Sequence, residues 1–298
     1  MEKMLVVLAG PTAVGKTGCG IEIAKHFGTE IISADSRQIY RETTIGTAVP
    51  SREELAAVRH HFIQALSVAD KYNASIYEHQ VLERLNLLFE KQDLVLMVGG
   101  SGLYIDSVCQ GIDDLPSVDP ELRDRLLKRF EVEGLDPLTQ ELKTRDPLSY
   151  KRVDLKNHMR VLKALEISIQ TGKPYSSFLL STRKERPFRI LRIALDMERE
   201  DLYNRINQRV VQMMEAGLLS EVKQLQHLRG YTAMKTVGYR ELFKYLDGDI
   251  PQEEAVDLIK RNTRKFARKQ ITWFRKDNLY KWYTPEDPRE IIRWIEAQ

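Results

Sequence analysis

The sequence predicts an α/β fold, in which a parallel sheet is flanked by helices and is interrupted by an all-helical insertion. Short apolar runs alternate with segments of helical periodicity, at spacings that are typical of βαβ units. A glycine-rich segment connects the first apolar run to the first helical segment. Strand patterns then disappear between about residue 115 and residue 187, and they return beyond it.

The amino-terminal part contains three short apolar runs, and the last of them ends at Gly99 and Gly100. Between these runs, apolar residues recur at the three- and four-residue spacing of amphipathic helices. We expect strands at Leu5–Ala9, Glu30–Ser33 and Leu94–Val98, and helices at Gly15–Phe27, Ser51–His61 and Ser75–Lys91.

The middle of the chain has helical periodicity alone. Its last helix should end at Gly172, because glycine favours a helix C-terminus and Pro174 lies just beyond it. The expected helices are Asp119–Glu131, Pro137–Lys143 and Leu155–Thr171. We therefore predict a core domain formed by residues 1–114 and 188–298, and a helical insertion domain formed by residues 115–187.

The carboxy-terminal part begins with a strand and continues mainly as helices. Ile190, Ile193 and Leu195 restore the strand pattern. The expected elements are a strand at Arg189–Met197, helices at Glu198–Ala216, Leu218–Leu228, Gly238–Leu246 and Glu253–Lys276, a short strand at Leu279–Tyr283, and a final helix at Pro288–Ala297.

The composition excludes several classes of protein. Of the 298 residues, 42% are apolar and 30% charged, as in ordinary globular proteins. The apolar run Met4–Ala9 is far too short for a membrane helix or a signal peptide. Cys19 and Cys109 are the only cysteines, which excludes a zinc framework or a disulfide scaffold. We expect a cytoplasmic protein that is not associated with a membrane.

The positive charge is concentrated near the carboxy-terminus. Eight Lys or Arg residues and no Asp or Glu lie between Lys260 and Lys276, which leaves 38 of the 46 basic residues against 43 acidic ones elsewhere. This pattern favours a face that binds a polyanion over a merely solvated helix. Ile259, Phe266 and Trp273 recur every seven residues, so we expect them to pack inward.

The glycine-rich segment GPTAVGKT matches the phosphate-binding pattern G-x-x-x-x-G-K-[ST] between a predicted strand and a predicted helix. Its glycines let backbone N–H groups face an anion, its lysine neutralises phosphate charge, and its threonine can ligate Mg²⁺. The motif predicts a P-loop NTPase-like core that binds a diphosphate, without specifying ATP. The predicted binding residues are Gly10, Pro11, Thr12, Ala13, Val14, Gly15, Lys16 and Thr17.

A carboxylate follows the second predicted strand, in the segment IISADSRQIY. Asp35 lies at the carboxyl end of that strand, where open α/β sheets bind their ligands. This position suits a helix cap, a ligand of metal-bound water, or a base. A GTPase is excluded, because it would need an N-K-x-D motif and the chain contains no Asn-Lys pair.

Several separated blocks resemble the tRNA dimethylallyltransferase family. They are GPTAVGKT, IISADSRQIY with IGTAVP, VGGSGLY, RVLKALEISIQTGKP, NRINQRVVQMMEAGLLSEV, TVGYRE and TRKFARKQITWFR. Their order runs over nearly the whole chain, and the combination is highly specific. Ser101 replaces a frequent threonine but keeps the hydroxyl, whereas Arg59, Gln64 and Lys235 depart from the usual residues.

The resemblance implies transfer of a dimethylallyl group from dimethylallyl diphosphate to the N6 amine of adenosine 37, next to the tRNA anticodon. It implies Mg²⁺ as cofactor, held by Thr17, Asp35 as the base, and Arg209 on the diphosphate, with Thr17 and Arg209 also taking part in catalysis. Arg205 lies four residues from Arg209 and should share its helix face. We expect a monomer. The residues that the resemblance places near the anticodon stem-loop are Asp35, Ser36, Arg37, Gln38, Ser101, Met159, Arg160, Lys163, Lys235, Gly238, Arg240, Arg268, Lys269 and Arg275.

Three other functions are compatible with parts of the pattern. A P-loop kinase of a small molecule or nucleotide would use the same loop and carboxylate, but it leaves the basic helix unexplained. An isopentenyltransferase acting on free adenine nucleotides would not need the helical insertion. A non-enzymatic RNA-binding switch would need base-reading signals that the chain lacks.

Overall fold

The computed structural model describes residues 2–113, 115–179 and 183–298. Parallel strands form one sheet in the order β3-β2-β4-β1-β5-β6, so the central strand is the one that leads into the glycine-rich loop. Central strands are almost completely buried, which accounts for their continuous apolar runs. The strands are β1 (Met4–Ala9), β2 (Ile31–Ala34), β3 (His60–His61), β4 (Leu94–Gly99), β5 (Arg189–Leu195) and β6 (Lys281–Tyr283).

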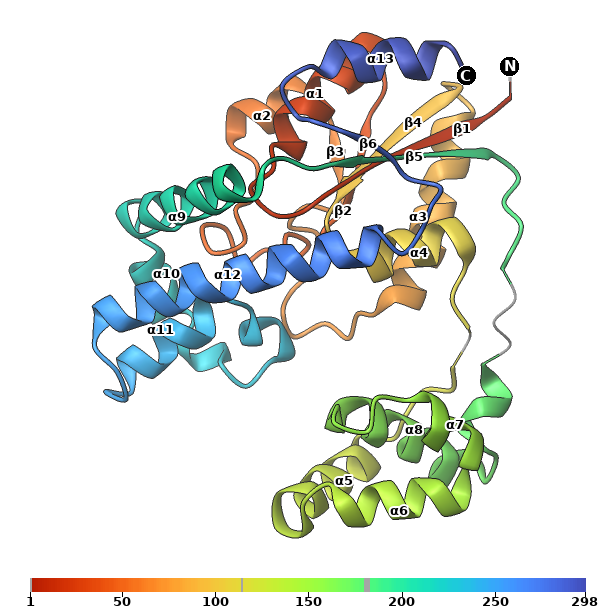
Figure 1. The fold of residues 1–298 in the computed structure, drawn as a ribbon, viewed down its shortest axis with the longest axis vertical. Coiled ribbons are helices and arrows are strands. Elements are labelled where there is room, and N and C mark those ends of the chain that lie inside the picture. The colour runs from red at the N-terminus through yellow and green to blue at the C-terminus, as the bar shows by residue number, and fades with distance from the viewer. Residues whose placement is uncertain (1, 114, 180–182) are drawn as a thin grey trace. The chain divides into compact units, whose positions relative to one another are not determined.

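Helices cover both faces of this sheet (Figure 1). On one face, α1 (Lys16–Phe27) packs beside α13 (Pro288–Glu296), and their apolar side chains share a core with β1 and β5. On the other face, α3 (Ala74–Phe89) packs against α4 (Gly102–Gln110). The short helix α2 (Arg52–Ala57) starts at a capping box formed by Ser51 and Glu54.

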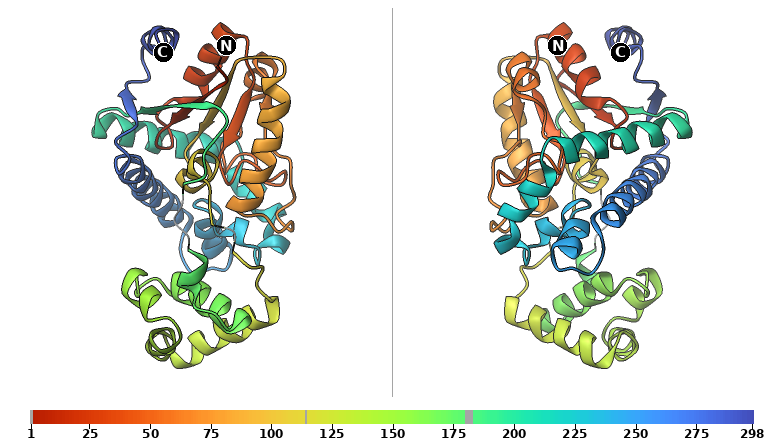
Figure 2. Two further views of the ribbon diagram at one scale, coloured as in Figure 1. Left: turned by 90° about the vertical axis from the view of Figure 1, so that its right-hand side faces the viewer. Right: turned by 90° about the vertical axis from the view of Figure 1, so that its left-hand side faces the viewer.

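The remaining helices of the core lie beyond the carboxyl ends of the strands (Figure 2). The long helix α12 (Gln252–Phe274) packs against α9 (Arg199–Glu215) and α11 (Tyr239–Leu246), and α10 (Leu218–Gln224) packs against α11. A second apolar core joins these helices to the loop after β2, through Ile39, Tyr239 and Ile259. This arrangement places helices of the last third of the chain against loops of the first third.

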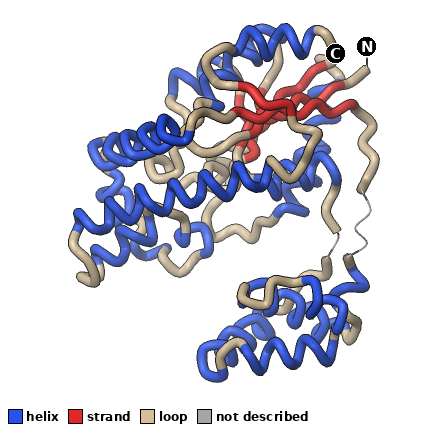
Figure 3. The backbone as a smooth tube through the Cα atoms, viewed as in Figure 1, coloured by secondary structure: helices blue, strands red, loops and turns tan. Residues whose placement is uncertain are grey.

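Residues Gly111–Lys184 form a separate compact unit, and the residues up to Gln110 and from Glu185 onward form the other. The described residues of the smaller unit form helices and loops, without a strand (Figure 3). Leu138, Leu142 and Leu165 are among its buried core residues. Its main helices are α5 (Pro120–Glu133), α6 (Asp136–Arg145), α7 (Pro147–Arg152) and α8 (His158–Thr171).

The predicted α/β fold class is confirmed, and most elements lie within a few residues of their expected bounds. The first predicted domain boundary, at residue 114, lies outside the described residues. The helix expected at Ser51–His61 was too long. Val58 is extended, with φ −149° and ψ 138°, so α2 ends before it and the chain enters the edge strand β3. There the ring of His61 lies 2.6 Å from a Glu30 carboxylate oxygen.

Two helices were not expected, and one expected helix is broken. The helix α4 follows glycines that conceal its start, and α7 is only 6 residues long. The helix expected at Leu218–Leu228 stops as α10 at Gln224 and continues as a 3₁₀ turn. In the described part of the chain, no helix combines the length and the apolar character that crossing a membrane requires.

Candidate functional site

The loop after β1 is bent by residues with positive φ. Gly10 has φ 152°, and a Cβ atom there would lie 2.8 Å from the Leu195 carbonyl oxygen, so glycine is required. Gly15 has φ 107° and leads directly into α1. Ala13 also has a positive φ, of 66°, which is unfavourable for alanine. The loop therefore has the strained backbone expected of an anion-binding loop.

The lysine of this loop has an altered acidity. Burial lowers the pKa of Lys16 to about 8; the nearby Asp35 carboxylate opposes this shift, and Arg209 adds to it. The Lys16 ammonium donates a hydrogen bond of 2.6 Å to the Pro11 carbonyl oxygen, across the loop. A dianionic ligand would compensate the cost of holding this charge in a partly desolvated place.

Asp35 closes the turn after β2. Its Oδ1 accepts hydrogen bonds from the backbone N–H groups of Arg37, at 2.8 Å, and Gln38, at 3.3 Å. The helix cap that the spacing allowed is not formed, because residues 36–39 form a turn and not a helix; Asp35 caps that turn instead. The same residue also lines the cavity that contains Lys16 and Thr17. Capping fixes the carboxylate in place without removing it from the site.

Ser101 connects two of the loops. Its Oγ accepts a hydrogen bond of 2.9 Å from the Ser36 N–H and donates one of 3.1 Å to the Ser36 Oγ. Its own N–H donates to the Ala34 carbonyl oxygen at 3.1 Å. The VGGSGLY and DSRQIY blocks therefore meet at the carboxyl ends of β4 and β2.

These loops surround a cavity of about 730 Å³. Its walls also come from α9, from α12 and from the segment just before α11, all of which lie far from the loops in sequence. The predicted site residues that line it are Thr12, Ala13, Gly15, Lys16, Thr17, Asp35, Ser36, Arg37, Gln38, Ser101, Arg209, Gly238 and Lys269. The other loop residues, Gly10, Pro11 and Val14, are buried and do not line the cavity.

Arg205 and Arg209 lie on one face of α9, as their spacing predicted, and both line the cavity. Arg209 is the deeper of the two. Burial lowers the pKa of Arg209, and the Asp35 and Glu54 carboxylates oppose that shift. Arg205 is exposed and lies 3.7 Å from a Glu286 carboxylate oxygen. The two arginines therefore have different surroundings on the same helix face.

The expected apolar stripe of α12 was wrong at two of its three positions. Ile259 is buried, but Phe266 is 46% exposed and Trp273 is 37% exposed. Both aromatic side chains line the cavity. The inward face of α12 instead contains Ala267, Gln270 and Phe274, which are buried. Trp273 lies against the start of α4, where a Cβ atom at Gly102 would lie 2.3 Å from its ring.

Two polar residues that the sequence analysis did not single out hold loops of the site. Glu221 of α10 accepts hydrogen bonds from the N–H groups of Thr44, Ile45 and Gly46, at 2.8 to 3.1 Å, and from the Tyr239 hydroxyl at 2.6 Å. Gln270 of α12 bonds the loop after β1. A polar residue on the buried face of a helix is the signal that identifies Gln270 in the sequence.

The other residues that the resemblance assigned to tRNA do not line the cavity. Lys235, Arg240, Arg268 and Arg275 are exposed on the larger unit. Arg240 contacts the Glu241 carboxylate at 2.6 Å, and Arg275 contacts Asp196 at 2.9 Å. Met159, Arg160 and Lys163 belong to α8 of the smaller unit, where the first two are exposed and the third is half-buried.

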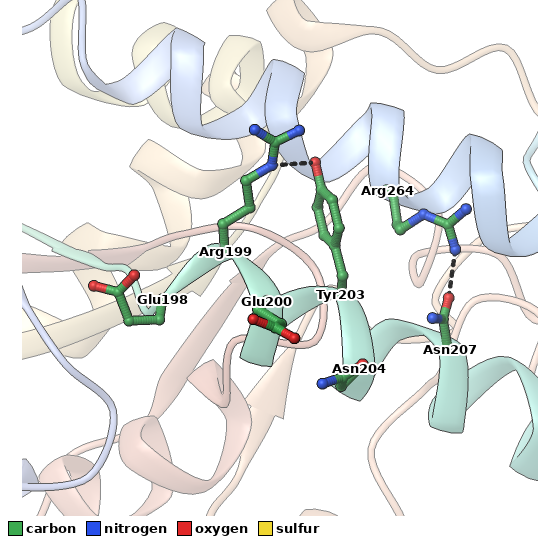
Figure 4. Close-up of a pocket in the computed structure, with 7 residues that line it drawn as sticks. All are labelled: Glu198, Arg199, Glu200, Tyr203, Asn204, Asn207 and Arg264. Atoms are coloured by element: carbon green, nitrogen blue, oxygen red, sulfur yellow. Dashed lines mark hydrogen bonds between the residues drawn. The ribbon is translucent and has the colours of Figure 1, made fainter.

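A second, shallow depression lies between α9 and α12, and Figure 4 shows its lining residues. Its two arginines already donate hydrogen bonds to neighbouring side chains. Arg199 donates to the Tyr203 hydroxyl at 3.1 Å, and Arg264 donates to the Asn207 side-chain oxygen at 2.6 Å. This depression contains none of the phosphate-loop residues, so the chemistry belongs to the larger cavity.

A magnesium ion fits the loop only with help from a substrate. Among the described residues, no group of three or more His, Cys, Asp or Glu side chains could hold a metal ion. Mg²⁺ is commonly bound by one or two protein oxygens together with phosphate oxygens and water. Thr17 and Asp35 line the same cavity and provide such oxygens.

The fold and the site together define an α/β protein of the P-loop class, whose phosphate-binding loop forms one wall of a large cavity. The chain belongs to the IPP transferase family, whose model matches residues 38–277.

Known proteins resemble the chain over nearly its whole length. A tRNA dimethylallyltransferase of Phocaeicola vulgatus is 50% identical over 297 residues, covering 100% of this chain and 99% of the relative. The crystal structure of a tRNA isopentenylpyrophosphate transferase from Bacillus halodurans matches with a TM-score of 0.72 and 35% identity, covering 100% of this chain and 96% of that one.

A third match comes from crystallographic snapshots of a eukaryotic dimethylallyltransferase acting on tRNA. It has a TM-score of 0.77 at 26% identity, covering 91% of this chain and 69% of that chain. The resemblance drawn from the sequence blocks is thereby confirmed.

Proposed function

We propose that this chain transfers a dimethylallyl group from dimethylallyl diphosphate to the N6 amine of adenosine 37 in tRNA, on the 3′ side of the anticodon. One observation carries the proposal. The phosphate-binding loop, the Asp35 carboxylate and the exposed aromatic side chains of α12 line a single cavity. A diphosphate on the loop and an everted purine against the aromatic rings would therefore share this cavity with the carboxylate.

The diphosphate binds to the loop and leaves from it. As the bond between the donor carbon and the leaving oxygen breaks, negative charge grows on that oxygen, and groups that bind it more strongly accelerate the reaction. Lys16, Arg209 and the loop N–H groups supply that stabilisation. Burial lowers the pKa of Lys16 in the free site, and a bound diphosphate would oppose that shift by favouring the charged form of the lysine.

The acceptor amine needs a base. Its lone pair is delocalised into the adenine ring, so it attacks the donor carbon effectively only as its proton leaves. Asp35 accepts that proton. The two backbone N–H groups that bind Oδ1 fix the orientation of the carboxylate, and Ser101 fixes the adjacent Ser36. General-base catalysis of this kind contributes about 10²- to 10⁴-fold.

The tRNA provides the adenine from a single-stranded loop, where everting a base costs only a few kcal/mol. Phe266 and Trp273 are suited to stack on it, because both expose aromatic surface within the cavity. The basic residues of α12 bind phosphates of the anticodon stem-loop. Met159, Arg160 and Lys163 place the helical insertion against the same RNA.

The proposal includes Mg²⁺, held by Thr17 together with diphosphate oxygens. When bound, the ion neutralises charge on the leaving diphosphate. We also propose that the enzyme acts as a monomer in the cytoplasm, where its tRNA substrates are found.

One experiment tests the function directly. The purified protein is incubated with Mg²⁺, dimethylallyl diphosphate and either unmodified tRNA or AMP, and the nucleosides are identified by mass spectrometry. The expected product is N6-dimethylallyladenosine from tRNA alone. A product from AMP alone would instead support an enzyme of free nucleotides, and phosphorylation of a small molecule by ATP would support a kinase.

A further inference from the structure

One side-chain amide of α12 connects the two loops that carry the proposed chemistry. The Gln270 Oε1 accepts a hydrogen bond of 2.9 Å from the Thr12 N–H, in the loop after β1. Its Nε2 donates a hydrogen bond of 2.9 Å to the Gly100 carbonyl oxygen, in the loop after β4. Gln270 itself is buried, with 7% of its surface exposed.

The packing around this amide leaves it little freedom. A Cβ atom at Gly100 would lie 2.4 Å from the Gln270 Nε2 and 3.1 Å from the Gly10 carbonyl oxygen. Residues one turn away on the same helix face, Ala267 and Phe274, are completely buried. The amide therefore sits in a closely fitted space, and glycine at position 100 is what allows it to reach both loops.

Each loop positions a different reactant in the proposed reaction. The loop after β1 leads into Lys16 and Thr17 at the start of α1, which hold the leaving diphosphate. The loop after β4 contains Ser101, which bonds Ser36 next to the base Asp35. Gln270 thus connects the loop that precedes Lys16 to the loop whose Ser101 bonds the residue next to Asp35.

The two residues before Gln270 on α12 are not buried, and one of them, Lys269, lines the same cavity as Gln270. Arg268 and Lys269 are exposed, directly before the buried Gln270. The helix that provides the basic surface for tRNA is therefore bonded to the diphosphate loop through the next residue along the chain. A shift of α12 would be transmitted to Thr12 and Gly100.

We propose that Gln270 is a positioning residue, which fixes the spacing between the diphosphate loop and the loop that supports the base. This inference rests on the proposed function for its effect on catalysis. The role requires an amide specifically, because one atom must accept and the other must donate. Glutamate would place an acceptor against the Gly100 carbonyl, and methionine would fill the space without bonding to either loop.

The first test is kinetic. Gln270→Met and Gln270→Glu should each lower kcat for dimethylallyl transfer by about 10- to 100-fold, since small misplacements of reacting groups have effects of this size. The KM values for dimethylallyl diphosphate and for tRNA should stay within about threefold. Thr272→Ala is the matched control: it is an exposed residue of the same helix, and its kcat should not change. A kcat within twofold of wild type in Gln270→Met would overturn the proposal.

A second test uses the close contact at Gly100. Gly100→Ala should displace the Gln270 amide and lower kcat, because the added methyl group needs its space. In Gly100→Ala with Gln270→Ala, the smaller side chain removes the clash, so the second change should cause little further loss. Independent, multiplying losses from the two substitutions would contradict the proposed contact.

The third test does not depend on activity. Amide hydrogen exchange of the peptide containing Thr12 should be faster in Gln270→Met than in wild type, with unchanged exchange in β1. Equal exchange of that peptide would refute the positioning role, even if the wild-type enzyme proved inactive on tRNA. An inactive wild type with faster exchange in the variant would refute only the proposed function.

Discussion

The Ser101 Oγ accepts a hydrogen bond of 2.9 Å from the Ser36 backbone N–H, which connects the loop after β4 to the residue after Asp35. This bond needs an oxygen on the side chain at position 101, and it does not need the particular residue serine. The replacement of the threonine that is frequent in the family therefore preserves the contact.

Removing that oxygen should slow the reaction. Ser101→Ala leaves the Ser36 N–H without its partner, and a hydrogen bond of this kind contributes about 0.5–1.5 kcal/mol. We expect the single-turnover rate of dimethylallyl transfer to fall by about 3- to 10-fold. Ser101→Thr, which keeps the hydroxyl, should retain the wild-type rate. Equal rates for the alanine and threonine variants would show that the contact is dispensable.

Replacing Asp35 should separate its contacts in the turn after β2 from its proposed role as the base. The Asp35→Asn variant retains a side-chain oxygen that can accept from the Arg37 and Gln38 N–H groups, whereas Asp35→Ala loses both contacts. If the carboxylate is the base, both variants lose about 10²- to 10⁴-fold in single-turnover rate. Binding of tRNA, measured by filter retention, should be nearly unchanged. A rate for Asp35→Asn within threefold of wild type would leave only the capping role.

The strands and the phosphate-binding loop were predictable because their signals are local. Continuous apolar runs mark buried parallel strands, and the GPTAVGKT spacing contains the whole loop. Position at the carboxyl end of β2 was enough to single out Asp35. The different surroundings of Arg205 and Arg209 were not predictable, since their four-residue spacing gives the shared face but not the depth of either side chain.

The aromatic side chains of α12 illustrate what depends on tertiary contacts. Seven-residue spacing predicted that Phe266 and Trp273 pack inward, yet both are partly exposed in the cavity. Helical periodicity identifies a face but does not say whether protein or a ligand cavity lies opposite it. The helical pattern can mark Gln270 as a polar residue on a buried face, but it cannot give the two partners of its amide, which come from loops more than 160 residues away.

Arg209 and Arg205 should differ in their effect on the donor. Arg209 is held at the cavity wall beside Asp35, whereas Arg205 is exposed and paired with Glu286. Arg209→Gln should therefore raise the KM for dimethylallyl diphosphate about 10-fold or more, as expected for loss of a charged hydrogen bond of about 1.5–3 kcal/mol. Arg205→Gln is the matched control and should change that KM by less than threefold. Equal changes of this KM in the two variants would contradict the assignment of Arg209 to the diphosphate.

The pKa of Lys16 predicts a pH dependence. Burial lowers that pKa to about 8, so the lysine of the free enzyme loses its charge as the pH rises above this value. The kcat/KM for dimethylallyl diphosphate should be level up to about pH 7.5 and then fall, because this parameter reports groups of the free enzyme. Lys16→Arg, which stays charged, should lack the fall. A fall at the same pH in Lys16→Arg would assign it to another group.

The same pKa shift predicts that the contribution of Lys16 to stability rises with pH, whereas kcat/KM falls. The pKa of Lys16 in the folded protein, about 8, lies below the ordinary value of 10.5, so between these values the unfolded chain binds more protons. The free energy of unfolding contributed by Lys16 therefore rises with pH across this window. Relative to wild type, Lys16→Met should be most stabilising near pH 7 and progressively less so towards pH 10, as measured by urea denaturation. A difference that does not vary with pH would contradict the shifted pKa.

The basic face of α12 should determine the salt dependence of tRNA binding. Each phosphate contact that releases a counterion contributes about 0.7 to 0.9 to the slope of log K against log salt concentration. Arg268→Gln and Lys269→Gln remove exposed charges from α12, and each should lower the magnitude of the slope by that amount. Arg289→Gln removes an exposed charge from α13, on the far side of the core from α12, so it controls for net charge alone. If Arg289→Gln changed the slope as much as the α12 substitutions, tRNA affinity would depend on the total charge of the protein. This result would contradict a specific contact between α12 and the tRNA.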